Sequence, residues 1–89
     1  MRDMKYKGKK NLISMQLQVM RVLRSVSQQE LAARMQVLGV SIDQQSISKI
    51  ENNKRIVTDY ELACFCKALQ CSEQDLLKDF YKKYRRDEE

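Results

Sequence analysis

The chain has 89 residues, 43% hydrophobic and 33% charged, which is typical of one small domain with a modest core. It has no proline and two glycines, so the closely spaced turns of a β-barrel or β-sandwich are not expected and an all-α fold is predicted. No apolar segment approaches the length of a membrane helix, and no hydrophobic signal segment begins the chain. We therefore expect a cytoplasmic protein with no membrane partner.

The composition also argues against several kinds of chemistry. Without histidine, the chain has no histidine general base, no serine–histidine triad and no cysteine–histidine zinc site. Its three cysteines, an odd number, fit free thiols better than a disulfide framework. Cys64 and Cys66 point to opposite sides of a predicted helix, so they cannot hold one metal ion together. We expect a protein that is not an enzyme, has no catalytic residues, and uses no metal, other cofactor or small-molecule ligand.

The net charge of +5 is concentrated at the start of the chain. Residues 1–10 carry five basic side chains and one acidic one, whereas residues 11–77 carry seven of each kind. A neutral body with a basic arm suits a polyanionic partner, and a solubilising tail explains the arm equally well. Residues 1–9 are therefore interpreted as an arm that either follows phosphates or the minor groove, or is disordered.

The first predicted helix covers about residues 10–24, where Ile13, Leu17 and Met20 recur at helical spacing. Further apolar side chains lie off this stripe, and they either enlarge the core or form a dimer interface. They are Leu12, Met15, Val19 and Val22.

Three capping boxes predict the starts of three later helices. In each box a hydroxyl residue is followed three positions later by an acid, and apolar residues at helical spacing come next. The boxes begin at Ser27, Thr58 and Ser72. The first starts a helix over residues 27–38. The last starts an extended helix whose apolar stripe continues through Phe80, Tyr81 and Tyr84, again as core or as a dimer contact.

A short helix is predicted near residues 43–52, which brings the total to five. Gly39 can end the helix before it, Ser41 or Asp43 can cap its start, and Asn52 with Asn53 can end it.

The two sides of this short helix differ in chemistry. Ile47 and Ile50 share one face, which is expected to pack inward. The opposite face is polar, with amide, hydroxyl and ammonium groups that can hydrogen-bond the edges of bases. An ordinary solvated face has the same composition, so the pattern alone leaves both interpretations open. The residues of this face are Gln44, Gln45, Ser48, Lys49 and Asn52.

Glu51 lies at the edge of the apolar face, where an unpaired carboxylate is unfavourable. Arg21 lies four residues after Leu17, on the core side of the first helix. We expect a partly buried Arg21–Glu51 ion pair that joins the two helices; the alternative is two surface charges of little energetic effect.

Several segments, in this order, resemble the lambda-repressor-like helix-turn-helix family, which includes the Cro and cI repressors and is also called XRE-type. They are residues 27–32 (SQQELA), residues 45–55 (QSISKIENNKR), the apolar residues 62–69 and residues 72–77 (SEQDLL). The resemblance covers about residues 10–77. It implies a five-helix, all-α domain whose last helix extends into residues 78–89 as a charged helix or tail.

The resemblance also implies a role for each matching position. The helix over residues 27–38 corresponds to the first helix of the motif, and the short helix to the recognition helix in the major groove. The base-reading positions are Gln44, Gln45, Ser48 and Lys49. The phosphate-binding positions are Gln28, Asn52, Lys54 and Arg55. Arg21 and Glu51 match the internal ion pair of the family.

The chain departs from the family pattern at a few positions. Ile47 follows Leu31 by sixteen positions, where the family usually has about eleven, so the first motif helix or its turn is longer by about one helical turn. The recognition helix is then expected to enter the groove at an altered angle. Asn53 stands where the family usually has glycine. Cys66 and Cys71 are expected in the core, and Cys64 is expected to point outward.

The implied function is that of a sequence-specific transcriptional regulator without enzymatic activity. It would bind double-stranded DNA as a homodimer and repress a promoter by occupying an inverted repeat. The alternative is a protein-interaction module, such as an antitoxin-like or adaptor domain with weak DNA binding, whose partner is held by the first helix or by residues 78–89.

Overall fold

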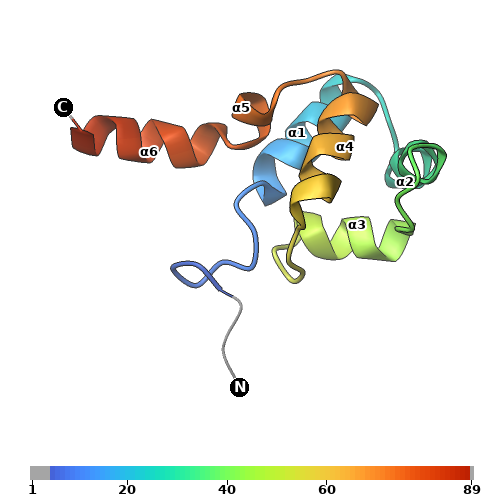
Figure 1. Ribbon diagram of the computed structural model, residues 1–89, viewed down its shortest axis with the longest axis horizontal. Coiled ribbons are helices and arrows are strands. Elements are labelled where there is room, and N and C mark those ends of the chain that lie inside the picture. Colours follow the sequence, from blue (N-terminus) through green and yellow to red (C-terminus); the bar gives the residue numbers. More distant parts are fainter. Residues whose placement is uncertain (1–4, 89) are drawn as a thin grey trace.

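The computed structural model describes residues 5–88, and within this range it contains six helices (Figure 1). The helices confirm the predicted all-α fold. Residues 1–4 of the expected arm, and residue 89, lie outside the described range. The helices are α1 (Ser14–Leu23), α2 (Gln28–Val37), α3 (Gln44–Glu51), α4 (Asp59–Leu69), α5 (Glu73–Leu76) and α6 (Lys78–Glu88).

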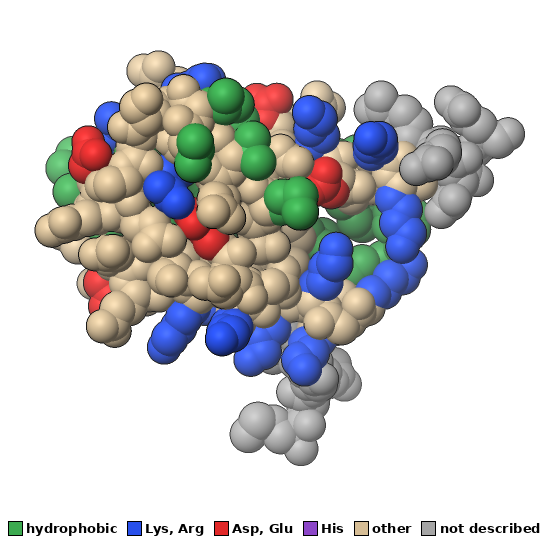
Figure 2. All heavy atoms as spheres, turned by 180° about the vertical axis from the view of Figure 1, so that it is seen from behind, with side chains coloured by type: hydrophobic (Ala, Val, Ile, Leu, Met, Phe, Trp, Pro, Cys, Tyr) green, Lys and Arg blue, Asp and Glu red, His purple; other side chains and the backbone are tan. Residues whose placement is uncertain are grey.

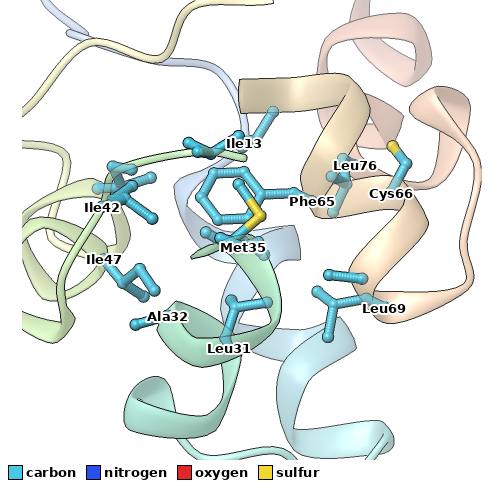
Figure 3. Packing of buried hydrophobic residues seen from close by; sticks show 14 of the residues in the cluster. Ile13, Leu31, Ala32, Met35, Ile42, Ile47, Phe65, Cys66, Leu69 and Leu76 are labelled. Carbon is cyan, nitrogen blue, oxygen red and sulfur yellow. The ribbon is translucent and has the colours of Figure 1, made fainter. Parts of the chain in front are cut away.

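Helices α1, α2, α3, α4 and α5 share one hydrophobic core, while α6 extends away from this body (Figure 1). Figure 3 shows Phe65 of α4 in the middle of the cluster, among side chains from α2, α3 and α5. Complete burial of an apolar side chain of this size contributes about 1.5–3 kcal/mol to stability. The largest fully buried side chains are Leu17, Leu31, Met35, Ile47, Ile50, Phe65, Leu69 and Leu76.

The predicted helix starts are present in the structure. At Ser27, Thr58 and Ser72 the hydroxyl accepts a hydrogen bond from the backbone N–H three residues later, and the acid at that position accepts one in return. Asp43, rather than Ser41, caps α3, and its carboxylate accepts a hydrogen bond of 2.8 Å from the backbone N–H of Ser46. Because the ends of these helices are satisfied locally, the sequence alone predicts them.

The segment between α2 and α3 accommodates the long spacing between Leu31 and Ile47. It turns at Gly39, whose φ of +88° suits a glycine, and then buries Val40 and Ile42 in the core. The additional residues therefore form a packed connection that holds α3 against α2.

Two helix boundaries differ from the prediction. Helix α1 begins at Ser14 rather than near residue 10, because the side chain of Asn11 bonds the backbone N–H of Ile13 and holds the preceding residues in a non-helical conformation. The predicted extended last helix is divided at Leu77 into α5 and α6. Leu76 is anchored in the core, whereas none of residues 78–84 is buried, so the chain leaves the core at this point.

The cysteines lie in or beside the core. Cys66 is buried, and this burial raises the pKa of its thiol to about 12, so the residue acts as a packing side chain at neutral pH. Cys71 is half-buried against the same cluster. The expectation that Cys64 points outward is wrong: it is half-buried and packs against the core from α4.

An ion pair fixes the loop between α3 and α4. The guanidinium of Arg55 forms two hydrogen bonds of 3.0 Å with the carboxylate of Glu61, which also accepts one from the backbone N–H of Thr58. The side chain of Glu61 is only 4% exposed. Burial raises the pKa of this carboxyl, but the hydrogen bonds from Arg55 and Thr58 outweigh it and hold the pKa below its usual value of 4.5.

We expect Glu61→Gln to lower the free energy of unfolding by about 2 kcal/mol at neutral pH, because Arg55 loses its counter-charge. The depressed pKa stabilises the parent fully above pH 4.5, and this contribution is lost as the pH falls through the lower pKa of the folded state. Urea unfolding at a series of pH values should therefore show the difference between variant and parent shrinking below pH 4.5.

The exposed Glu73 of α5 provides the control, and Glu73→Gln should change stability little. A difference between Glu61→Gln and the parent that persists unchanged into acid would contradict a stabilising charge on Glu61.

Candidate nucleic-acid interface

Helix α3 lies along one edge of the body, below α2 and α4 in the view of Figure 1. Ile47 and Ile50 are both fully buried, so they fix which side of the helix faces the core. The side that carries Gln45, Ser48 and Lys49 then faces outward, because residues two positions apart point to nearly opposite sides of a helix. The inward face predicted for the two isoleucines is confirmed.

The outward side presents the residues expected to recognise bases. Gln44, Gln45 and Lys49 are exposed, and Ser48 is half-buried next to them. Within the described part of the chain, the amides of Gln44 and Gln45 form no hydrogen bond. Both glutamines therefore keep their donors and acceptors available for a ligand, as bidentate recognition of a base requires.

A polar network behind α3 connects three helices. The guanidinium of Arg21 (α1) donates to Glu51 (α3) through two hydrogen bonds of 2.7 and 3.0 Å, and a third bond of 3.0 Å reaches the carbonyl of Val26. Gln28 (α2) donates to the same carboxylate at 3.0 Å. The side chains of Arg21 and Glu51 are 13% and 4% exposed. Glu51 is thus fully engaged inside the protein, in the pairing expected from the sequence.

This network also includes Gln28, one of the residues expected to bind a phosphate. Its amide points to Glu51, next to the N-terminal end of α2, and its side chain is half-buried. In this arrangement Gln28 orients α2 and α3 relative to each other.

The expected phosphate-binding residues after α3 fall into two groups. Lys54 is exposed, and Asn52 is exposed with its amide donating to the carbonyl of Ser48 at 2.8 Å. Arg55 is half-buried and bound to Glu61. Lys54 therefore presents its charge to solvent, whereas much of the charge of Arg55 is neutralised inside the protein.

Sequence reasoning missed Asn11, and it assigned Asn53 to the end of α3 without its contact to the segment before α1. Asn11 is 7% exposed and donates to the backbone carbonyls of Ile50 and Arg55 at 3.0 and 2.9 Å. Asn53, with a left-handed φ of +59°, donates to the carbonyl of Asn11 and accepts from the backbone N–H of Lys10 at 2.7 Å. In the sequence, only Asn53 at the usual glycine position pointed to this contact between the segment before α1 and the end of α3.

Two other kinds of feature are absent from the described residues. In residues 5–88, no three His, Cys, Asp or Glu side chains are grouped as a metal site would need. No helix among these residues combines the length and apolar character needed to cross a membrane.

Comparison with known protein families places this arrangement of helices in context. Residues 16–80 match the family model of the Cro/C1-type helix-turn-helix (HTH) DNA-binding domain. This range includes α2, α3, α4 and α5 in full. No curated protein matches the chain.

The network around Glu51 predicts a large loss of stability when it is broken. Arg21→Ala and Glu51→Ala should each lower the free energy of unfolding by about 3–5 kcal/mol, because each leaves a charge with little access to water and without its opposite charge. Urea unfolding monitored by circular dichroism measures this loss. Lys67→Ala, on the exposed side of α4, is the control and should unfold almost like the parent. Equal midpoints for all three variants would contradict a stabilising pair.

Proposed function

The chain belongs to the Cro/C1-type helix-turn-helix DNA-binding domain family, and we propose that it is a sequence-specific transcriptional regulator that binds double-stranded DNA. Its recognition helix is α3, and α2 is the first helix of the motif. The observation that carries the proposal is the pair of exposed glutamines at the start of α3, held outward by two fully buried isoleucines. Its role is one of binding rather than catalysis.

In this proposal the polar residues of α3 contact bases, and those of the loop after it contact phosphates. Gln44, Gln45, Ser48 and Lys49 contact base edges in the major groove, where each base pair presents a distinct pattern of donors and acceptors. Lys54 and Asn52 contact phosphates at the end of the helix and set the register. Gln28 and Arg55 act at the same surface by holding α2 and the loop in place, with any phosphate contact added to those internal bonds.

The regulator is proposed to work as a homodimer on an inverted repeat. Such dimers place their recognition helices about one turn of DNA apart, so that each reads one half-site. A second copy would pack on the exposed apolar stripe of α1, which lies on the face shown in Figure 2. Phe80 and Tyr84 are half-buried and lie against Tyr6, so they are less accessible to a second copy than the stripe of α1. The stripe consists of Met15, Val19, Val22 and Leu23.

Occupation of a promoter by this dimer would exclude the transcription machinery, so repression is the proposed outcome. Because α3 lies along one edge of the domain, binding of DNA through α3 would leave the exposed apolar stripe of α1 for a second copy.

We expect recognition and phosphate binding to be separable by mutation. Gln44→Ala or Gln45→Ala should weaken binding to the preferred duplex by about 1–3 kcal/mol and leave non-specific binding nearly unchanged. Lys54→Ala should weaken binding to every sequence alike and flatten the dependence of log affinity on log salt by about one unit. The preferred duplex is first selected from a random pool, and fluorescence anisotropy over a salt series then measures both effects.

Gln74→Ala, at an exposed position of α5, is the matched control and should bind like the parent. If the glutamine variants lose affinity for all duplexes alike, the division of tasks is wrong. If the parent binds duplex weakly and without sequence preference but binds another protein at nanomolar concentration, the domain is a protein-interaction module instead.

The dimer interface has its own test. Val22→Asp places a charge in the apolar stripe of α1 and should shift the protein from dimer to monomer in sedimentation equilibrium, with weaker binding to the inverted repeat. Val37→Asp introduces the same charge at an exposed valine of α2 and should leave the dimer intact. A parent that is monomeric both free and on DNA would exclude the dimer, and an unchanged dimer in Val22→Asp would exclude this face.

A further inference from the structure

The lysines before α1 lie beside the loop that follows the recognition helix. The backbone N–H of Lys10 donates to the side chain of Asn53 at 2.7 Å, and Asn53 is the immediate neighbour of Lys54. The side chains of Lys9, Lys10 and Lys54 are all exposed. Three cationic side chains from two distant parts of the sequence are therefore brought to one surface.

This arrangement is fixed by buried hydrogen bonds. Asn11 is 7% exposed, and its amide binds the carbonyls of Ile50 and Arg55, at the end of α3 and in the loop after it. Asn53 returns two bonds of 3.0 Å, to the carbonyl of Asn11 and to the hydroxyl of Ser14. The two asparagines thus hold the backbone before α1 against the end of the recognition helix.

A second contact holds the other end of the segment. Residues 6–9 form a tight turn in which Tyr6 and Lys9 exchange two backbone hydrogen bonds of 2.7 and 2.9 Å. The hydroxyls of Tyr6 and Tyr84 are hydrogen-bonded at 2.8 Å, and the ring of Tyr6 lies 6.2 Å from that of Phe80. The segment from Tyr6 to Asn11 is therefore attached both to α6 and to the α3–α4 loop.

We propose that Lys9 and Lys10 bind DNA phosphates next to the phosphate bound by Lys54, and that Asn53 is the residue that positions them. The inference rests on the proposed function and extends its contact surface beyond the helix-turn-helix. Figure 2 shows Lys and Arg side chains in a row along the lower edge of the molecule, the edge formed by α3, its following loop and the segment before α1.

The charge distribution explains why these lysines are needed. Of the two basic residues in the loop after α3, Arg55 is bound to Glu61, so Lys54 is left as the cation that this loop presents to solvent. A duplex carries about one negative charge per 1.7 Å of its axis, so neighbouring phosphates are available on both sides of the one that Lys54 contacts. Lys9 and Lys10 supply the further positive charge at that position.

The experiment measures the binding of a fluorescein-labelled mixed-sequence duplex over a series of salt concentrations. Each neutralised phosphate contributes about 0.9 to the slope of log affinity against log salt. Lys9→Gln/Lys10→Gln should therefore flatten the slope by about two units relative to the parent. Lys67→Gln/Lys78→Gln removes the same charge from exposed positions on α4 and α6, outside the segment before α1 and the loop after α3, and should leave the slope nearly unchanged.

A second variant tests the positioning role without a change of charge. Asn53→Gly keeps a residue that accepts the left-handed φ of +59° but removes the amide that holds Lys10 and Asn11. Its slope should fall between those of the parent and the double lysine variant, and amide exchange at Lys10 should become faster.

The outcomes separate the two proposals. A parent without salt-dependent duplex binding overturns the proposed function itself. A parent that binds normally, with equal slopes for the Lys9/Lys10 variant and the Lys67/Lys78 control, overturns only the phosphate contact. A flattened slope for the lysine variant with a parental slope for Asn53→Gly overturns the positioning role of Asn53.

Discussion

The carboxylate of Glu51 is the group on which the arrangement of the proposed recognition surface depends. It accepts hydrogen bonds from Arg21 of α1 and Gln28 of α2 while belonging to α3, so one buried charge fixes three helices relative to one another. Burial of a carboxylate is unfavourable unless its lone pairs are satisfied, which makes any other packing of these helices less stable. Together with Ile47 and Ile50, Glu51 therefore determines how deeply α3 is packed against the core and how the helix is rotated about its own axis.

This constraint matters because α3 is too short to be stable alone. It has eight residues, and isolated helices shorter than about 12–15 residues are marginal in water. Four of its polar residues are exposed or half-buried and add little to stability; they are Gln44, Gln45, Ser48 and Lys49. The helix forms because Asp43 caps its start, two isoleucines enter the core and Glu51 is paired behind it. The residues of α3 that are proposed to recognise DNA are therefore residues that the fold does not need.

The sequence predicted the features whose cause is local and missed those whose cause is a distant contact. Capping boxes and the inward isoleucines follow from spacing along single helices. The Arg21–Glu51 pair is the exception: its residues are 30 positions apart, and it was predicted because each lies on the core side of its own helix. The start of α1 was not predicted: Asn11, whose side chain accepts a hydrogen bond from the N–H of Ile13, also donates to the carbonyls of Ile50 and Arg55, which follow it by 39 and 44 residues, and these distant contacts do not follow from local spacing. The binding of Arg55 to Glu61 likewise requires the loop and α4 to be placed first. Cys64 was misplaced since α4 is buried over more of its circumference than its apolar pattern indicates.

The contact between Asn11 and Asn53 also changes how the basic segment before α1 should be understood. A disordered segment loses backbone conformational entropy when it binds, at a cost of about 1–2 kcal/mol for each residue that becomes ordered. Here the ordering of residues 9–11 takes place during folding, because their hydrogen bonds are made to the loop and helix of the same domain. Cations placed in advance retain more of their attraction to phosphates as binding free energy. The same two asparagines also couple the segment to the end of α3, so a shift of the recognition helix in the groove would carry the adjacent lysines with it.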